Sequence, residues 1–456
     1  MLLGARYARL FLFVGDLAVF VLSLWLTLFV RTGVLPTEKI ILDHALPFLL
    51  LFCLWLLVFY MAGLYEKRAV LFKRELPSAL LTTQFFNIIL AALFFFFIPI
   101  FGITPKTTLI IYLGISLAFI YLWRLVIFPR LTARGVRIGA ALIGSGPEVD
   151  DLVHEVNNNP RYRIEFRIVR APQTITPAEA EEFAHELEEK DISIIVIDAE
   201  NNANRSSVSL IYEFAFVKRT YQFADLYQVY EEVFDRVPLS LLRYDWFLKH
   251  VSHPVHGFYI VARRALDIVG GLSMGIITAI ATPFIWIAMR IEGKGPLFIV
   301  QERMGMHGAK MKVYKFRSMS FNDATSRDWV GEGKNKITRV GAFLRLTSLD
   351  EFPQFLNVLK GEISLIGPRN DIEGLGKRLA EVIPYYNIRY IVKPGITGWA
   401  QINQQYEQGH ISPQSIEETK TRLAYDFYYI KNRSLMLDIV IALRTIKRML
   451  FRVSSW

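Results

Sequence analysis

Residues 10–30 read LFLFVGDLAVFVLSLWLTLFV, an apolar run that contains a single charged residue, Asp16. A helix needs about 20 apolar residues to cross the hydrocarbon core of a bilayer, so this run predicts a transmembrane helix. Three further runs of sufficient length follow it, at about 45–65, 79–101 and 108–128. The sequence therefore predicts a membrane protein that begins with a four-helix transmembrane bundle over residues 1–130.

The distribution of lysine and arginine predicts the orientation of this bundle. The connections on one side carry nine basic residues, namely Arg6, Arg9, Lys67, Arg68, Lys73, Arg74, Arg130, Arg134 and Arg137. The connections on the other side carry three, namely Arg31, Lys39 and Lys106. Because basic residues are retained in the cytoplasm, both ends of the bundle are expected there. Everything after residue 130 is then cytoplasmic unless another segment crosses.

Two charged residues, Asp16 and Arg124, fall inside the predicted spans. One interpretation is an ion pair within the membrane or a contact with substrate. The other is that Arg124 extends its side chain to the interface near a span end, while Asp16 faces the bundle. We expect the second arrangement.

The composition limits the class of protein and of partner. Of the 456 residues, 53% are hydrophobic, and the formal net charge is +10. A basic apolar chain suits anionic lipid or a phosphate-bearing substrate. Nucleic acid is not expected, because no basic run accompanies a recognisable reading motif. The single cysteine, Cys53, excludes a disulfide framework and a cysteine zinc cluster. A cleavable signal peptide is not expected, since no small-residue cleavage site follows the long first run.

Residues 136–250 have the composition of a small α/β domain. Strand patterns cover 137–143, 163–169 and 192–198, and helical patterns cover 147–158 and 177–189. This alternation predicts a parallel sheet of the doubly wound, Rossmann-like type. The turn at Gly144 and Gly146 is a candidate nucleotide site, but it lacks the third glycine of the dinucleotide fingerprint. We therefore expect a structural or regulatory domain without a cofactor.

A fifth apolar run, residues 268–291, is also long enough to span. Pro283 interrupts it and, together with Thr282, favours a kink. Three glycines are expected to loosen its first half, namely Gly270, Gly271 and Gly275. Basic residues flank both ends, namely Arg263, Arg264, Arg290 and Lys294. A helix–break–helix that enters and leaves by the cytoplasmic face satisfies the positive-inside rule at both ends. The alternative is a straight fifth span with an external C-terminal domain.

The segment after this run contains cations among apolar residues and turn glycines, which indicates phosphate binding rather than a solvated charged face. These cations are Arg303, Lys315, Arg317, Arg345 and Arg369. Arginine suits phosphate because it donates two parallel hydrogen bonds. Between them lies one acidic pair, Asp350 and Glu351. One carboxylate of such a pair can attack phosphorus, and its neighbour can hold Mg²⁺.

The acidic pair also has a structural interpretation. Ser348 and Glu351 have the spacing of a capping box, and acidic residues favour the first turn of a helix. The two interpretations are compatible, because a helix N-terminus also attracts phosphate. Spacing alone does not choose between them.

Three strings carry a resemblance to a known family. They are KFRSM at 315–319, SLDEFPQFLNVLKGEISLIGPR at 348–369 and KPGITGWAQIN at 393–403. With these strings the chain resembles the bacterial sugar transferase family, the monotopic phosphoglycosyl transferases. Four preceding spans and an α/β insert are similar to its large form. The resemblance implies an α/β catalytic domain over 260–456, mounted on the re-entrant helix 268–291, in a bacterial inner-membrane protein.

The resemblance also implies a reaction. A hexose 1-phosphate passes from a UDP-sugar to undecaprenyl phosphate, and UMP is released, in the first membrane step of exopolysaccharide, O-antigen or capsule synthesis. Asp350 matches the family nucleophile, which forms a phosphosugar–aspartyl intermediate, and Glu351 matches the dyad member associated with Mg²⁺. A homodimer is a further possibility that the family suggests.

Other site residues follow from the same resemblance. Positions at the phosphate site are matched by Arg303, Lys315, Arg317, Arg345, Gly367, Pro368 and Arg369. Asp426 matches an acidic residue that joins the active site. Thr282 and Pro283 match the break in the re-entrant helix. The chain departs from the family at Asn370, where proline is usual, and at Ser318, where threonine is usual. Neither departure removes a charge, so they bear on local geometry or sugar choice.

Two other classes of protein remain as alternatives. A membrane-bound nucleotide-sugar dehydratase also combines four spans with a doubly wound domain, but it needs a full GxGxxG and a Tyr-x-x-x-Lys pair. A non-enzymatic regulator of polysaccharide export would release no UMP from UDP-sugars. The identity of the sugar does not follow from the sequence.

Overall fold

The computed structural model describes residues 5–62, 64–65, 76–98, 106–132, 137–159, 162, 164–172, 176–198, 221–251, 257–293, 295–319, 337–405 and 413–454. The chain forms two compact units, Met1–Val229 and Tyr230–Trp456. Most of the predicted 136–250 domain lies in the first unit with the membrane helices. Residues 230–250 lie in the second unit, where Val237 N donates to Ala424 O at 3.2 Å. Several of the basic residues used to predict orientation, such as Lys67 and Arg74, fall outside the described residues.

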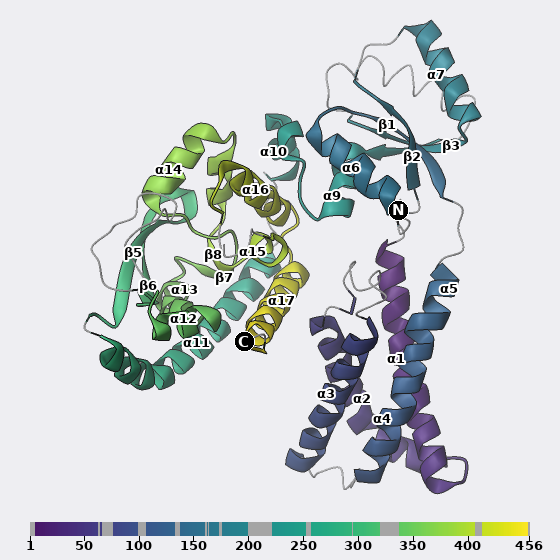
Figure 1. Cartoon of the computed structure of the whole chain (residues 1–456), viewed down its shortest axis with the longest axis vertical. Coiled ribbons are helices and arrows are strands. Elements are labelled where there is room, and N and C mark those ends of the chain that lie inside the picture. The colour runs from purple at the N-terminus through teal and green to yellow at the C-terminus, as the bar shows by residue number, and fades with distance from the viewer. Residues whose placement is uncertain are drawn as a thin grey trace. The chain divides into compact units, whose positions relative to one another are not determined.

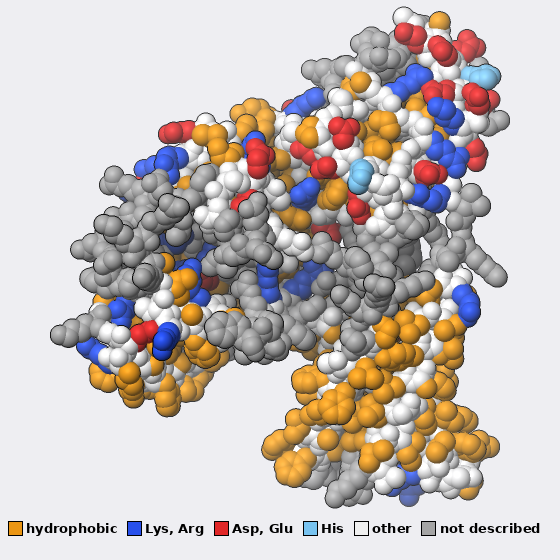
Figure 2. All heavy atoms as spheres, in the orientation of Figure 1, with side chains coloured by type: hydrophobic (Ala, Val, Ile, Leu, Met, Phe, Trp, Pro, Cys, Tyr) orange, Lys and Arg blue, Asp and Glu red, His pale blue; other side chains and the backbone are white. Residues whose placement is uncertain are grey.

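The four predicted spans are helical. They are α1 (Ala5–Thr32), α2 (Glu38–Met61), α3 (Leu76–Phe97) and α4 (Lys106–Tyr121), the last continued by a π-helix (Leu122–Ile127) and α5 (Phe128–Thr132). Figure 2 shows hydrophobic side chains over the visible outer face of these helices. Such a surface is stable against lipid but not against water, so this part of the chain is a membrane domain.

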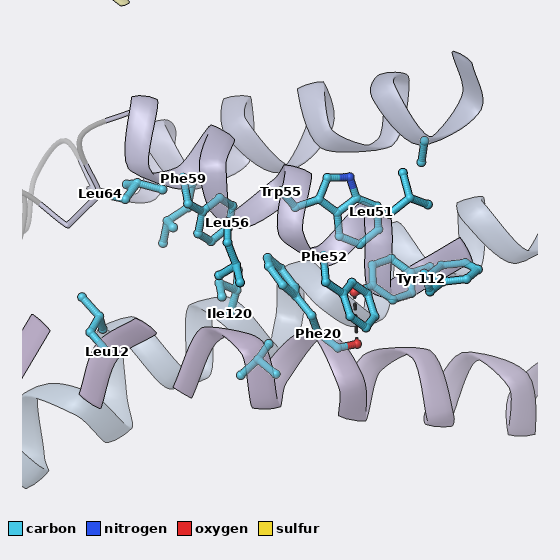
Figure 3. Packing of buried hydrophobic residues seen from close by; sticks show 14 of the residues in the cluster. Leu12, Phe20, Leu51, Phe52, Trp55, Leu56, Phe59, Leu64, Tyr112 and Ile120 are labelled. Carbon is cyan, nitrogen blue, oxygen red and sulfur yellow. Dashed lines mark hydrogen bonds between the residues drawn. The ribbon is translucent and has the colours of Figure 1, made fainter. Parts of the chain in front are cut away.

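Aromatic rings fill the interior of the membrane helices. Phe20 of α1 packs edge-on against Trp55 and Phe59 of α2, with ring centroids 5.5 and 5.3 Å apart. Tyr112 of α4 packs 5.2 Å from Trp55 and donates to Phe20 O at 3.2 Å (Figure 3). The rings therefore join three helices by packing, which is the main source of helix association in lipid.

Asp16 and Arg124 form an ion pair inside the membrane helices. Both side chains are buried, and Arg124 Nε donates to Asp16 Oδ1 at 3.0 Å. Arg124 also donates to Leu64 O at 2.8 Å, and Tyr65 donates to Asp16 Oδ2 at 2.6 Å. The expectation that Arg124 extends to the interface was wrong. The π-helix that carries Arg124 lies within reach of Asp16, and pairing satisfies both charges without exposing either.

The sheet of the first unit is parallel, as predicted. Its strands are β1 (Ile138–Ile143), β2 (Ile164–Arg170), β3 (Ile192–Ile197) and β4 (Gln222–Asp225), in the order β2-β1-β3-β4. The helices α6 (Pro147–Asn158) and α7 (Pro177–Glu189) follow β1 and β2. The chain thus places β2 on one side of β1 and then β3 and β4 on the other side, which is the strand order of a doubly wound sheet. The strand β4 was not predicted, because its four residues give too short a pattern.

The second unit is mainly helical around two small sheets (Figure 1). Strands β5 (Phe298–Met304) and β6 (Lys310–Phe316) pair antiparallel, and β7 (Ser364–Ile366) and β8 (Gly395–Thr397) pair parallel. The main helices are α10 (Tyr244–His250), α11 (Gly257–Glu292), α12 (Arg339–Leu346), α13 (Phe355–Lys360), α14 (Glu373–Val382), α15 (Trp399–Asn403), α16 (Ile416–Lys431) and α17 (Leu435–Ser454), with the 3₁₀-helices η5 (Leu349–Gln354) and η6 (Tyr386–Ile391).

The fifth apolar run lies within α11, a helix of 36 residues that is long and apolar enough to cross a membrane. Helical structure continues through Pro283, so the predicted break is not an interruption of the helix. Thr282 Oγ1 donates to Thr278 O at 2.6 Å, a bond to the preceding turn that favours bending. Entry and exit of α11 by one membrane face stays a prediction.

The glycines of α11 allow close packing rather than looseness, which corrects our expectation. A Cβ on Gly271 would lie 3.0 Å from Leu359 Cδ2, and one on Gly275 would lie 2.9 Å from the ring of Phe355. Both neighbours belong to α13, the helix that follows the acidic pair. The absence of side chains at Gly271 and Gly275 therefore lets α13 pack closely against α11.

The basic residues at the start of α11 make internal contacts. Arg264 donates to Val358 O at 2.8 Å and to Leu359 O at 2.6 Å, at the C-terminal end of α13. Cations at a helix C-terminus satisfy carbonyl groups that lack helical partners. Arg263 donates to Ile366 O at the end of β7. These two arginines tie α13 and β7 to α11.

Candidate active site

Asp350 and Glu351 lie on η5, between α12 and α13. Ser348 precedes η5 with a left-handed φ of 57°, and its side chain makes no capping hydrogen bond. The capping-box interpretation of Ser348 and Glu351 was therefore wrong. Because η5 packs on β6 and α11, a strand and the membrane helix hold the two carboxylates in place.

Glu351 is held between two cations. Its Oε1 accepts hydrogen bonds from Lys315 Nζ at 2.7 Å and from Arg369 Nη2 at 2.8 Å. Burial alone would raise the pKa of Glu351, but Arg369 and Lys315 outweigh it and hold that pKa well below its usual range. Glu351 is therefore a permanent anion at physiological pH, and it keeps the two cations side by side.

Asp350 differs from its neighbour in having no such partner. Among the described residues, no hydrogen bond or ion pair joins Asp350 to another side chain. Its carboxylate is half-buried. Burial, and then the adjacent charge of Glu351, raise the pKa of Asp350 to about 6. At neutral pH this carboxylate is mostly ionised and half-buried, and no hydrogen-bond partner of it lies among the described residues; these are the properties of a usable nucleophile.

Arg303, at the end of β5, completes the cationic side of the site. It donates to Gln301 Oε1 at 2.8 Å and to Asn370 O at 3.3 Å. Burial, and then repulsion from Arg369, lower the pKa of Arg303 to about 10. A cation that is buried beside another cation favours an anion, so this arrangement suits a phosphate group.

The turn Gly367-Pro368-Arg369 places Arg369 at Glu351. Gly367 N donates to Thr397 O at 2.8 Å, and a Cβ on Gly367 would lie 2.6 Å from Lys393 O. Only glycine fits this approach between the ends of β7 and β8. The two sequence motifs, GPR and KPGITG, are therefore a single structural feature.

Arg345 and Arg317 occupy different surroundings. Arg345 lies in the last turn of α12, and it is one of the cations that partly offset the rise in the pKa of Asp350. Arg317 is buried after β6, with its guanidinium packed against Gly295, where a Cβ would collide with it. Arg345 therefore belongs to the surroundings of the acidic pair, and Arg317 supports the chain beside β6.

Asp426 makes its contacts in a buried network of charges. Its Oδ2 accepts from Arg389 Nη2 at 2.8 Å, and Arg389 in turn donates to Asp371 and to Arg369 O. Asp426 is 1% exposed. The resemblance predicts that Asp426 belongs with the phosphate-binding residues, and this stays a prediction. The partners of Asp426 in the structure are protein groups.

Sequence reasoning missed the other members of this network. They are Asp371, Arg389, Arg422, Tyr386 and Tyr390. Arg422 and Asp426 are four residues apart in a helical pattern, and Tyr386, Arg389 and Tyr390 have the spacing i, i+3, i+4. Charges at helical spacing among aromatic residues were the available signal.

The carboxylates provide the hard oxygen atoms that Mg²⁺ prefers. Within the described ranges, no group of three or more His, Cys, Asp or Glu side chains is placed to hold a metal ion. Mg²⁺ usually takes one or two carboxylates and completes its shell with phosphate and water. Glu351 uses Oε1 for both of its ion pairs, which leaves Oε2 for such a role. The residues present therefore fit a Mg²⁺ that arrives with a diphosphate.

Comparison with known proteins finds similarity in this region. Residues 258–452 match the family model described as bacterial sugar transferase. A UDP-N-acetylgalactosamine-undecaprenyl-phosphate N-acetylgalactosaminephosphotransferase of Aeromonas hydrophila is 34% identical over 227 residues, which cover 49% of this chain and 51% of that protein. A UDP-glucose:undecaprenyl-phosphate glucose-1-phosphate transferase of Escherichia coli is 37% identical over 195 residues, 42% of this chain and 41% of that protein.

A shorter relative is covered almost completely. An exopolysaccharide production protein of Rhizobium leguminosarum is 35% identical over 193 residues, which are 41% of this chain and 94% of that protein. The chain therefore spans about half, or less, of the two longer relatives, but nearly all of this shorter one.

Proposed function

The chain belongs to the bacterial sugar transferase family, and we propose that it transfers a hexose 1-phosphate from a UDP-sugar to undecaprenyl phosphate, releasing UMP. The printed names of two relatives describe transfer of this kind, with N-acetylgalactosamine in one and glucose in the other. A third is named for exopolysaccharide production, which supports a place in the first membrane step of polysaccharide synthesis.

One observation carries this proposal. Lys315 and Arg369 converge on Glu351, while the adjacent Asp350 has no partner among the described residues. Clustered cations are needed to offset the negative charge of the phosphate groups. Covalent transfer also needs a nucleophile beside them that is not held in an ion pair. Lys315 of β6 and Arg369 after β7 meet the first requirement, and Asp350, the neighbour of Glu351 on η5, meets the second.

In the first step, Asp350 attacks the phosphorus atom that carries the sugar. An Asp350 carboxylate oxygen forms a bond to this phosphorus, and the bond from phosphorus to the bridging oxygen of UMP breaks. The electron pair leaves with that oxygen, so UMP departs as an anion and an acyl phosphate remains on the enzyme. Arg369, Lys315 and Arg303 lie where they would offset the charge that develops on the phosphate oxygens.

In the second step, an oxygen of undecaprenyl phosphate attacks the same phosphorus atom. The bond between this phosphorus atom and the Asp350 oxygen breaks, and the electron pair returns to the Asp350 carboxylate. The product is a lipid diphosphate that carries the sugar. The contact of α13 and η5 with α11 would keep this chemistry at the membrane surface, where the lipid phosphate lies. We place the reaction at the cytoplasmic face of the bacterial inner membrane, with α11 entering and leaving by that face.

Mg²⁺ is the proposed cofactor. Glu351, together with the diphosphate, would hold it, and the ion would neutralise negative charge on the nucleotide. Glu351 has a second role that does not depend on the metal, because its anion keeps Lys315 and Arg369 close together before substrate binds.

The test is UMP release by the purified full-length chain in detergent with undecaprenyl phosphate, Mg²⁺ and a panel of UDP-sugars. We expect one or a few sugars to support release, and Asp350→Asn to abolish it while the protein remains folded. Absence of UMP release with every UDP-sugar would contradict the proposal. Full turnover by Asp350→Asn would remove Asp350 as the nucleophile.

A further inference from the structure

Arg369, which contacts Glu351, lies in a segment whose main-chain carbonyl groups are fixed by hydrogen bonds. Four successive carbonyl groups, those of residues 368–371, each accept a hydrogen bond from another part of the second unit. The donors, in order along the segment, are Gly395 N at 2.9 Å, Arg389 Nη2 at 2.8 Å, Arg303 Nη1 at 3.3 Å and Met304 N at 2.9 Å. The Cα position of Arg369 is therefore fixed by its neighbours in the fold rather than by Glu351.

Arg389 is the donor to Arg369 O itself, and other charged residues determine its position. Its side chain is 1% exposed. Its Nε and Nη2 lie 3.1 and 2.8 Å from Asp426 Oδ2, and its Nη1 donates to Asp371 and, at 2.9 Å, to the hydroxyl of Tyr386. All three nitrogens of the guanidinium are therefore engaged by protein groups.

The network around Arg389 is balanced in charge. Asp371 accepts from Arg422 at 2.7 Å on its other oxygen, so two arginines meet two aspartates. Arg389, which is buried with all three of its nitrogens engaged, cannot bind a diphosphate without losing partners that it needs. Arg369 is different, because its side chain is 30% exposed and Glu351 is its partner. The network around Arg389 is thus suited to holding the main chain, and Arg369 is suited to binding the substrate.

We propose that Asp426 and Arg389 are positioning residues, which hold the main chain of Arg369 so that its guanidinium stays at Glu351 and beside Asp350, and that neither residue touches the diphosphate. This inference rests on the proposed function for its reaction. It assigns Asp426 a role through Arg389 and Arg369 rather than a direct contact with phosphate.

The direct test is a double-mutant cycle between Asp426→Asn and Arg369→Gln in the full-length protein. Asp426→Asn alone is expected to lower kcat/KM for the UDP-sugar by about 10-fold or more, and to add no more than about 2-fold when Arg369→Gln is already present. Multiplicative losses would overturn the proposal, because they would show that Asp426 acts independently of Arg369.

A matched control separates positioning from a general loss of stability. Glu231→Gln also removes one charge from an ion pair of the second unit, that of Glu231 with Lys431 at 2.8 Å. We expect Glu231→Gln to keep wild-type kcat/KM even where its melting temperature falls as far as that of Asp426→Asn. Equal losses of activity in both variants would contradict a specific role. If Asp426→Asn does not fold, the same cycle is run with Tyr386→Phe, which removes the bond that Tyr386 donates to Asp371 and the two that it accepts from Arg389 and Arg422.

A second readout keeps this inference separate from the proposed function. Calorimetry with UDP measures diphosphate binding without turnover, and the same non-additivity is expected in its Kd. If the wild-type protein binds UDP but releases no UMP, the proposed function fails while the cycle in Kd still tests the positioning role. Additive effects on UDP binding, with normal UMP release by the wild type, would overturn the positioning role alone.

Discussion

Asp350 and Glu351 are neighbours in the chain, yet their pKa values are displaced in opposite directions. Burial and the charge of Glu351 raise the pKa of Asp350 to about 6, whereas Arg369 and Lys315 overcome burial and hold that of Glu351 far below its usual range. Such a separation assigns different tasks to two like groups, because one remains a fixed anion and the other stays available to react.

The first prediction concerns pH. In the proposed reaction Asp350 attacks as a carboxylate, so its protonation would remove activity, and its raised pKa moves that loss to a higher pH than an ordinary aspartate would give. We expect kcat/KM to fall as pH decreases through about 6, while Glu351 remains ionised across the whole range. Initial rates of UMP release between pH 5 and pH 8 measure this. A rate that stays flat to pH 5 would contradict the assignment of the titrating group.

The second prediction removes the adjacent anion. Glu351→Gln leaves Lys315 and Arg369 without their shared partner and takes away the charge that helps to raise the pKa of Asp350. We expect a loss in kcat of about 100-fold or more, with the remaining activity showing its acidic limb at lower pH than the wild type. A limb that moves to higher pH would show that the charge of Glu351 does not control Asp350.

The third prediction tests the close packing of α11 against α13. Gly275→Leu would push a side chain into the ring of Phe355, so we expect a loss of stability of about 1–3 kcal/mol, from overpacking. Gly257→Leu is the matched control in the same helix, because nothing lies within 4 Å of a Cβ there. Thermal unfolding in detergent compares the two. Equal melting temperatures would mean that α13 does not pack against this face.

The fourth prediction concerns the ion pair in the membrane helices. Asp16→Asn leaves Arg124 without its partner in a buried position, and we expect a loss of stability of about 3–5 kcal/mol. Replacing both residues, as Asp16→Leu with Arg124→Met, is expected to recover part of that loss, because no charge is then left unpaired. The folded yield and the melting temperature of the three variants measure this. A double variant that is less stable than Asp16→Asn would contradict the argument.

Much of this organisation could be predicted from the sequence because it is local. The apolar runs predicted the helices of the membrane domain, and the alternation of strand and helix patterns predicted the order of β1, α6, β2, α7 and β3. The cations of the site were also found, since Lys315 and Arg369 lie in recognisable strings. These features depend on spacing and composition, which the chain displays directly.

The features that were missed depend on contacts between distant segments. Arg124 pairs with a residue 108 positions away, and Arg389 joins Asp371 to Asp426 across 55 positions of sequence. From the sequence alone, Gly271 and Gly275 of α11 could either loosen the helix or allow close packing, and the contact with α13 shows close packing. No local pattern distinguishes a buried arginine with a partner from an exposed one, so such networks become visible only in the folded chain.

The most direct measurement of the central claim is mass spectrometry of the full-length chain after incubation with its UDP-sugar and Mg²⁺, without undecaprenyl phosphate. The account predicts one sugar phosphate attached to the peptide that contains Asp350, which is lost when undecaprenyl phosphate is added and absent from Asp350→Asn. An adduct on a different residue, or continued turnover with no adduct at Asp350, would contradict it.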